Sequence, residues 1–233
     1  MAHTVFIDGS AGTTGLRIGE RLRHERDIHL LTLPEARRKD LGARLDAAAA
    51  SEVSLLCLPD EAAREFVRHA PATARICDTS TAHRNTPGWV YGFAELHGQR
   101  AAIKDATRVA NPGCHASGFI ALTRPLCDAG ALRREALLTC QSLTGYSGGG
   151  KAMIAEYEAA ERPAALAAPR LYGLSLQHKH LPEMRVQSTL AQAPLFTPVV
   201  APFYSGMLVS VPLFAAQLAD GFVDGKRLAE LLT

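Results

Sequence analysis

The chain has 233 residues, of which 47% are hydrophobic and 21% charged, and its formal net charge is +2 at pH 7. This composition is typical of a globular protein and excludes a collagen-like or intrinsically disordered chain. No apolar run approaches the ~20 residues of a membrane-spanning helix, and Asp8 interrupts the N-terminal segment before a signal-peptide core can form. We therefore expect a cytoplasmic protein that does not partner a membrane.

Aromatic residues make up only 6% of the chain, and the basic residues are scattered along it. This pattern predicts neither a stacking surface nor a basic stripe for nucleic acid, and it favours a small-molecule partner. The five cysteines are an odd number without a CxxC pair or metal-finger spacing, so we expect reduced thiols and no metal site. They are Cys57, Cys77, Cys114, Cys127 and Cys140.

The first hundred residues alternate short apolar runs with amphipathic stretches. Continuous apolar runs predict strands of a parallel sheet that is covered on both faces, and the intervening stretches predict helices. The expected strands are 5–7, 28–33, 53–58 and 75–77, and the expected helices are 14–25, 41–50 and 60–69. The sequence therefore predicts an α/β fold that begins with a Rossmann-type parallel sheet.

The pattern changes near residues 107–113, where a short strand leads into Asn111-Pro112-Gly113 and Cys114 opens an apolar helix that reaches Asp128. Beyond it we expect strands over 136–143 and 206–214, a helix over 151–161 and a loop over 163–169. Longer antiparallel strands with inserted helices predict an α+β second domain. We therefore divide the chain into residues 1–113 and 114–233.

A glycine-rich loop with G-x-x-G-x-x-G spacing joins the first strand to the first helix. Glycines there let the backbone approach a pyrophosphate, whose charge is met by free N–H groups at the helix N-terminus. A tight strand-to-helix turn is the alternative, but the position after the first strand favours a dinucleotide site. The residues concerned are Gly9, Ser10, Ala11, Gly12, Thr13, Thr14 and Gly15.

The choice between NAD and NADP depends on the end of the second strand, where an acidic residue binds the ribose 2′-hydroxyl and arginine binds a 2′-phosphate. Arg37, Arg38 and Lys39 follow this strand and favour NADP, with Glu35 as a competing ligand for the hydroxyl and a solvated basic run as the other alternative. Ser80 lies just past another strand end, at the edge where open sheets bind ligands, and is a candidate cofactor contact.

Cys114 is the candidate nucleophile, because helix N-termini stabilise thiolates. His178 and His180 supply a possible base, and in an extended segment residues two apart share a face, so that both can point into the site. The glycines at 148–150 supply possible backbone donors. A structural cysteine and core or metal-ligand histidines are the alternatives. The combination favours nucleophilic catalysis.

These residues also carry a family resemblance. The glycine loop, Asn111-Pro112-Gly113-Cys114, the segment 145–151 (Gly-Tyr-Ser-Gly-Gly-Gly-Lys) and the segment 178–184 (His-Lys-His-Leu-Pro-Glu-Met) resemble the shorter-chain N-acetyl-gamma-glutamyl-phosphate reductases. The resemblance runs from about residue 4 to 214 and implies a glyceraldehyde-3-phosphate dehydrogenase-like architecture. The implied domains are a Rossmann-type NADP-binding domain and a catalytic and dimerisation domain. His115 departs from the family, which more often has an aromatic residue there.

The resemblance implies an NADPH-dependent reduction of an acyl phosphate in arginine biosynthesis, through a thioester on Cys114. His178, with His180 as the alternative, would be the acid/base. The expected substrate contacts are Ser147, Gly148 and Lys151, with Glu183 orienting a histidine; helix capping and surface solvation are the alternatives. We also expect a homo-oligomer.

The resemblance further implies that the family's C-terminal segment is missing from this sequence. A catalytically impaired NADP-binding relative with a regulatory or structural role is therefore the second hypothesis. A cysteine hydrolase or acyltransferase is a third.

Overall fold

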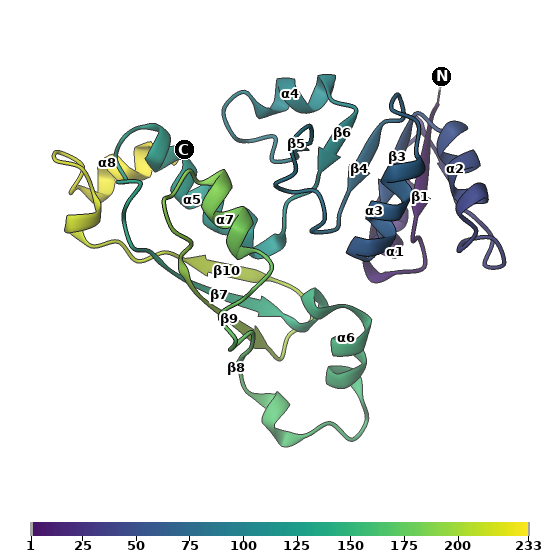
Figure 1. The fold of residues 1–233 in the computed structure, drawn as a ribbon. Helices are drawn as coiled ribbons and strands as arrows, with labels where there is room; N and C mark the ends of the chain where they lie inside the picture. The colour runs from purple at the N-terminus through teal and green to yellow at the C-terminus, as the bar shows by residue number, and fades with distance from the viewer. Residues whose placement is uncertain (1, 233) are drawn as a thin grey trace. The chain divides into compact units, whose positions relative to one another are not determined.

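A computed structural model describes residues 2–232, which form two compact units that meet in sequence between Pro112 and Gly113. Figure 1 shows the chain from its N-terminal unit to its C-terminal unit. The units are described separately. Among the described residues, no helix is long and apolar enough to cross a membrane.

The first unit is built on a parallel sheet, which within residues 2–112 has six strands in the order β2-β1-β3-β4-β6-β5 (Figure 1). Its strands are β1 (His3–Asp8), β2 (Ile28–Leu31), β3 (Val53–Leu56), β4 (Ile76–Asp78), β5 (Val90–Tyr91) and β6 (Arg108–Ala110). Its helices are α1 (Thr13–Leu22), α2 (Leu41–Ala49), α3 (Asp60–His69) and α4 (Gln99–Asp105).

Alternation along the strands assigns side chains to the two faces of this sheet. Phe6, Leu56 and Ile76 are at most 2% exposed and pack with Phe66 of α3 and with alanines of α2. Ile7, the neighbour of Phe6, points to the opposite face, where α1 lies. Helices on opposite faces are what right-handed crossovers from β1 to β2 and from β2 to β3 require.

The second unit contains a mixed sheet, which within residues 113–232 has four strands in the order β10-β7-β9-β8 (Figure 1). The strands are β7 (Thr139–Gly145), β8 (Arg170–Leu171), β9 (Leu195–Ala201) and β10 (Met207–Ser210). The helices are α5 (Cys114–Asp128), α6 (Gly150–Glu158), α7 (Leu181–Gln187) and α8 (Gly225–Glu230), with 3-10 turns η1 (Tyr146–Gly149), η2 (Ala164–Ala167) and η3 (Ala215–Gln217).

The central pair of this sheet, β7 and β9, is parallel over its full length, so the expectation of an antiparallel second domain was wrong for these strands. A parallel pair needs a long crossover connection, and residues 146–194 provide one that contains α6 and α7. The outer pairs, β10 with β7 and β8 with β9, are antiparallel. The α/β fold with two sheets is confirmed.

Helix α5 packs closely on the sheet through Gly118. A Cβ at this position would come within 2.5 Å of Val209 on β10, so only glycine allows this approach. The side chains that point from β7 toward α5 are buried, among them Ser142 at 0% exposure. The start of α5 is thereby fixed against the centre of the sheet.

The segment that carries His178 and His180 is not extended throughout, contrary to the expectation from the sequence. His180 has helical backbone angles and α7 begins at Leu181, with Pro182 in its first turn, a position that suits proline. The strand expected over 206–214 is shorter, and η2 lies inside the stretch expected to be a loop.

Candidate active site

Cys114 is the first residue of α5, and of the five cysteines, all within the described residues, it is the exposed one. None of these five cysteines forms a disulfide bond. Burial raises the pKa of Cys57 and Cys77 to about 11 and that of Cys140 to about 12, and it also raises the pKa of Cys127. Accessibility and helix position therefore single out Cys114 as the reactive thiol.

His115 follows Cys114 in the helix and points into the second unit, where it is 3% exposed. Its Nδ1 lies 2.7 Å from the hydroxyl of Ser142 on β7, and its Nε2 lies 2.6 Å from the hydroxyl of Tyr172. Burial, with a smaller effect of His178, lowers the pKa of His115 to about 4. The ring is therefore neutral near pH 7.

His178 and His180 gather around the same ring. Their centroids lie 5.7 and 5.6 Å from that of His115 and 4.7 Å from each other, and Phe196 packs against both His115 and His178. The structure thus brings the two predicted histidines together, although the reason differs from the expected strand periodicity. They meet because a turn precedes α7.

The backbone N–H of His180 donates a hydrogen bond of 3.2 Å to Nδ1 of His178. A nitrogen that accepts carries no proton, so neutral His178 holds its proton on Nε2. Burial first, and then the charge of Lys179, lowers the pKa of His178. The half-buried His178 ring can therefore offer an Nε2–H donor, whereas His180 is 4% exposed.

Glu183, a residue of α7, is 1% exposed and lies against the start of α5. Its carboxylate accepts a hydrogen bond of 2.7 Å from the backbone N–H of Gly113, the residue before Cys114. A carboxylate at a helix N-terminus is favoured by the unpaired N–H groups there. This contact fixes the backbone from which Cys114 projects.

The predicted substrate residues Ser147, Gly148 and Lys151 lie in η1 and at the beginning of α6, immediately beyond β7. Gly145 allows the chain to enter this turn, because a Cβ there would come within 2.7 Å of the Phe203 and Tyr204 carbonyl oxygens. The N–H groups of residues 145–147 donate to carbonyls of the 203–206 loop. Ser147 is half-buried, and Gly148 and Lys151 are exposed.

In the first unit, the glycine loop connects β1 to α1. Gly9 has φ +80°, and a Cβ there would lie 2.3 Å from the Cys57 carbonyl oxygen; one on Gly15 would lie 2.4 Å from the Gly9 carbonyl oxygen. Gly12 is the N-cap of α1, and its N–H donates to Gly9. Asp8, just before the loop, forms a buried 2.8 Å ion pair with Arg44, although burial still raises the pKa of Asp8.

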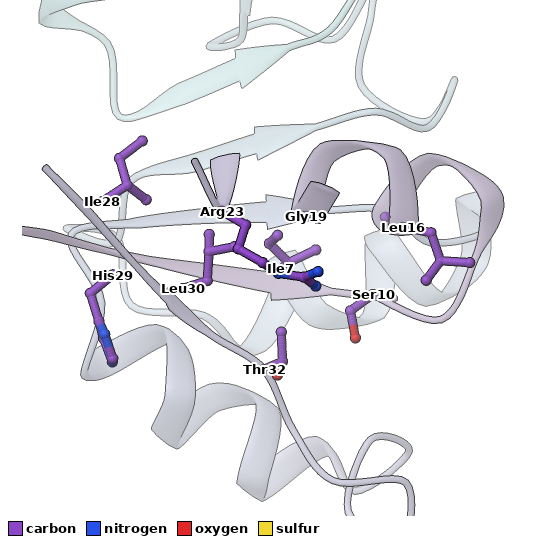
Figure 2. A pocket seen from close by; sticks show the side chains of 10 residues that line it. Ile7, Ser10, Leu16, Gly19, Arg23, Ile28, His29, Leu30 and Thr32 are labelled. Carbon is purple, nitrogen blue, oxygen red and sulfur yellow. The ribbon is translucent and has the colours of Figure 1, made fainter. Parts of the chain in front are cut away.

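A cavity of about 310 Å³ lies between α1 and the edge of the sheet (Figure 2). Ser10 and Thr32 lie toward one end and Ile28 and His29 toward the other, with Arg23 between them. The Ser10 end follows the carboxyl ends of β1 and β2, the edge at which open α/β sheets bind ligands.

The basic residues after β2 are exposed in a turn, and they differ in their contacts. Arg38 forms an exposed ion pair of 2.6 Å with Glu35. No such ion pair is recorded within the described residues for Arg37. The two arginines are therefore not equivalent as anion ligands.

Ser80 lies in a buried network at the carboxyl end of β4. Its N–H and hydroxyl both donate to the Asp78 carboxylate, at 2.9 and 2.6 Å, and its oxygen accepts the N–H of Ala82. His83 Nδ1 lies 2.6 Å from the same carboxylate, and its ring stacks on Trp89. Ser80 thus shapes this edge of the sheet through Asp78.

Ser142 and Tyr172 were not predicted from the sequence, and His115 was noted there only as a departure from the family. His115 directly follows the candidate nucleophile, which was an available signal; Ser142 and Tyr172 are joined to it only by the fold. Among the described residues, no cluster of three or more His, Cys, Asp or Glu side chains is arranged to hold a metal ion.

Known structures share the fold of the whole chain. Aspartate semialdehyde dehydrogenase II from Vibrio cholerae, complexed with ASA, aligns with a TM-score of 0.70 and 15% identity over 99% of this chain and 78% of that one. A probable aspartate-semialdehyde dehydrogenase from Pseudomonas aeruginosa aligns with a TM-score of 0.69 and 17% identity over 99% and 78%. The family model described as "Semialdehyde dehydrogenase, dimerisation domain" matches residues 114–231. Fold and site thus define a semialdehyde dehydrogenase-like oxidoreductase.

Sequence relatives identify the branch. A protein from Rhizobium leguminosarum bv. trifolii named N-acetyl-gamma-glutamyl-phosphate reductase is 49% identical over 95% of this chain and 73% of its own length. A protein of the same name from Brucella ovis is 48% identical over 94% and 72%. The chain belongs to the N-acetyl-gamma-glutamyl-phosphate reductase family, as its motifs indicated.

Proposed function

We propose that this chain reduces N-acetyl-gamma-glutamyl phosphate to N-acetyl-glutamate semialdehyde with NADPH and releases phosphate, as a cytoplasmic step of arginine biosynthesis. The observation that carries the proposal is Cys114, an exposed thiol at the N-terminus of α5 that directly precedes His115, the residue against whose ring His178 packs. The names of the relatives support the substrate. A semialdehyde dehydrogenase from Candida albicans that aligns with a TM-score of 0.56 and 13% identity is described as being with NADP, which agrees with this cofactor.

The first unit fits a dinucleotide. Gly9, Gly12 and Gly15 keep the loop free of side chains where a Cβ would meet backbone, so a pyrophosphate can approach the N–H groups at the start of α1. Ser10, Ala11, Thr13 and Thr14 would complete this cradle, with Arg37 and Arg38 at the 2′-phosphate. When bound, the reduced nicotinamide supplies a hydride.

Cys114 begins the reaction in the second unit. Its thiolate attacks the acyl carbon, the bond from that carbon to the phosphate oxygen breaks, and phosphate leaves while a thioester forms on the sulfur. With a hydride supplied to the thioester carbon, the oxyanion that would form there stays bonded to Cys114. The Nε2–H of His178 donates to that oxyanion, with His180 as the alternative proton source. Cleavage of the carbon–sulfur bond then returns that proton to the histidine, releases the semialdehyde and restores the thiolate.

The substrate itself carries charge at both ends, a phosphate and a carboxylate. We assign their binding to Ser147, Gly148 and Lys151, because a lysine beside a glycine-rich turn offers a cation and accessible N–H groups. Glu183 contributes by holding the backbone at Gly113.

The reverse reaction tests the function. The full chain with semialdehyde, phosphate and NADP⁺ should increase the absorbance of reduced nicotinamide, and omission of phosphate should abolish the increase. The Cys114→Ser variant is the matched control. A chain that binds NADPH without any turnover would contradict the proposal and favour a regulatory or structural role.

We also propose that the chain forms a homodimer through the outer face of its mixed sheet. Leu208, Leu143, Val199 and Leu171 stand opposite one another on four adjacent strands, with Leu208 64% and Leu171 54% exposed. An exposed row of apolar side chains is typical of a surface that is buried against another protein, and the matching family model describes a dimerisation domain. Sedimentation should show a dimer that Leu208→Glu dissociates and that Val223→Glu, at another exposed apolar position, leaves intact.

A further inference from the structure

His115 stands between two hydroxyl groups, and its contacts restrict the protons of both. Ser142 lies on its Nδ1 side and Tyr172 on its Nε2 side, at 2.7 and 2.6 Å. A neutral imidazole donates from one nitrogen and accepts at the other. The three groups therefore form a chain of hydrogen bonds that runs in one of two directions.

The two directions differ in whether the Tyr172 hydroxyl proton remains available for a further hydrogen bond. If Nε2 of His115 accepts, the Tyr172 proton is used in that bond. If Ser142 donates to Nδ1, Nε2–H donates to the Tyr172 oxygen, and the Tyr172 proton remains available for a third group. Burial, together with the nearby charge of Cys114, raises the pKa of Tyr172 to about 12, so its hydroxyl keeps a proton to donate.

Cys114 is the third group. It directly precedes His115 at the start of α5, and the Nε2 of His115 lies 2.6 Å from the Tyr172 hydroxyl. The charge of Cys114 is, after burial, the second cause that raises the pKa of Tyr172. A thiolate at this helix end is a strong acceptor, and a charge-assisted hydrogen bond to it exceeds one between neutral partners.

We propose that Tyr172 donates a hydrogen bond to the Cys114 thiolate, and that His115, oriented by Ser142, is the positioning residue that directs the Tyr172 hydroxyl. The proposal rests on the proposed role of Cys114 as the nucleophile. In this proposal the imidazole of His115 has a role that a hydrocarbon ring at the same position cannot have. Only a ring nitrogen can form the hydrogen bond that orients the Tyr172 hydroxyl.

Other groups around the thiol also affect its titration. His178 and His180 face the His115 ring, Lys179 adjoins His178, and the Glu183 carboxylate accepts the Gly113 N–H. All of these stay in place in the variants below. Differences between the variants therefore report the Tyr172 hydroxyl and its orientation.

The experiment measures the pKa of Cys114 from the pH dependence of its alkylation by iodoacetamide, in the full chain without substrate or cofactor. Tyr172→Phe should raise this pKa by about one unit and slow alkylation near pH 7 about tenfold. Tyr157→Phe is the matched control, since it removes a hydroxyl that is bonded to Arg170 in the same unit, and it should change neither quantity.

His115→Phe keeps the ring and removes its nitrogens, so it should shift the pKa of Cys114 in the same direction by a smaller amount. Combined with Tyr172→Phe, it should add nothing. If His115→Phe fails to fold, Ser142→Ala tests the same orientation with both rings intact and should also raise the pKa. An unchanged pKa in Tyr172→Phe overturns the proposal, and additive shifts in the double variant overturn the positioning role. Neither outcome depends on reductase activity, so the proposed function is judged separately.

Discussion

The backbone N–H of Gly113 donates a hydrogen bond of 2.7 Å to the carboxylate of Glu183, a side chain that is 1% exposed. This bond ties the N-terminal end of α5 to α7, two helices that are far apart in the chain. It holds the peptide that leads into Cys114, so the nucleophile projects from a fixed backbone.

Loss of this acceptor should destabilise the second unit. Glu183→Ala leaves a buried N–H without its partner, which costs about 1–3 kcal/mol of unfolding free energy. Glu183→Gln retains an oxygen that can accept the bond and should cost less. Chemical denaturation of both variants and of the unchanged chain measures the free energies of unfolding. If Glu183→Ala is as stable as the unchanged chain, the hydrogen bond to Gly113 contributes nothing.

Cofactor preference should depend on Arg37 more than on Arg38, because Arg38 would have to give up its ion pair with Glu35 to bind a 2′-phosphate. Arg37→Ala should weaken NADPH binding about ten- to hundredfold relative to NADH, and Arg38→Ala should weaken it less. Glu35→Gln releases Arg38 and should strengthen NADPH binding. Fluorescence titration with both cofactors measures these changes; equal affinity of the unchanged protein for NADPH and NADH would refute the preference.

Cys114 should be the first thiol to react with limiting iodoacetamide near pH 7. It is exposed, whereas burial raises the pKa of Cys57, Cys77, Cys127 and Cys140. Peptide mass mapping identifies the labelled site, and acyl-phosphate substrate should protect it. Cys114→Ser should abolish reduction while NADPH binding persists. Earlier labelling of any other cysteine would remove the basis for the nucleophile.

The two histidines should contribute unequally to the rate. Since the His180 N–H fixes the proton of neutral His178 on Nε2, His178→Ala should lower kcat/KM by about a hundred- to ten-thousandfold and His180→Ala by much less. Because burial and the charge of Lys179 lower the pKa of His178 below its usual 6.5, the titration of His178 should not itself change the rate as the pH falls through that value. Steady-state kinetics of both variants across pH measure these losses. If His180→Ala loses more of its kcat/KM than His178→Ala, the two histidines exchange their proposed roles.

Much of this fold follows from local patterns. The helices Asp60–His69 and Cys114–Asp128 have the predicted bounds, because a proline or glycine before each helix and an apolar periodicity within it define its ends. The strands β8 and β9 were missed, and the pairing of β7 was misjudged. Strand pairing joins residues that are distant in sequence, so no local pattern encodes it.

The same limit applies to the site. Cys114, His178 and His180 stand in short motifs and were predicted, whereas Ser142 and Tyr172 meet His115 only through the packing of α5 on the sheet. The expectation that residues two apart share a face failed at His180, which has helical backbone angles. The rings still meet, because a turn before α7 brings them together.

His115 should make the stability of the chain depend on pH. Its pKa is about 4 in the folded protein and near 6.5 in the unfolded chain, so between these values the unfolded chain binds more protons. Its contribution is complete above pH 6.5 and decreases by about 3 kcal/mol as the pH falls to about 4. Chemical denaturation from pH 4 to 8 should therefore give a flatter, though not a level, profile for His115→Phe than for the unchanged chain, because the other groups with shifted pKa values, among them His178 and Asp8, remain. His69→Phe, at an exposed position in the other unit, should keep the original profile. If His115→Phe keeps the full slope, His115 must already be able to take up a proton in the folded protein, and its neutral state between Ser142 and Tyr172 would be disproved.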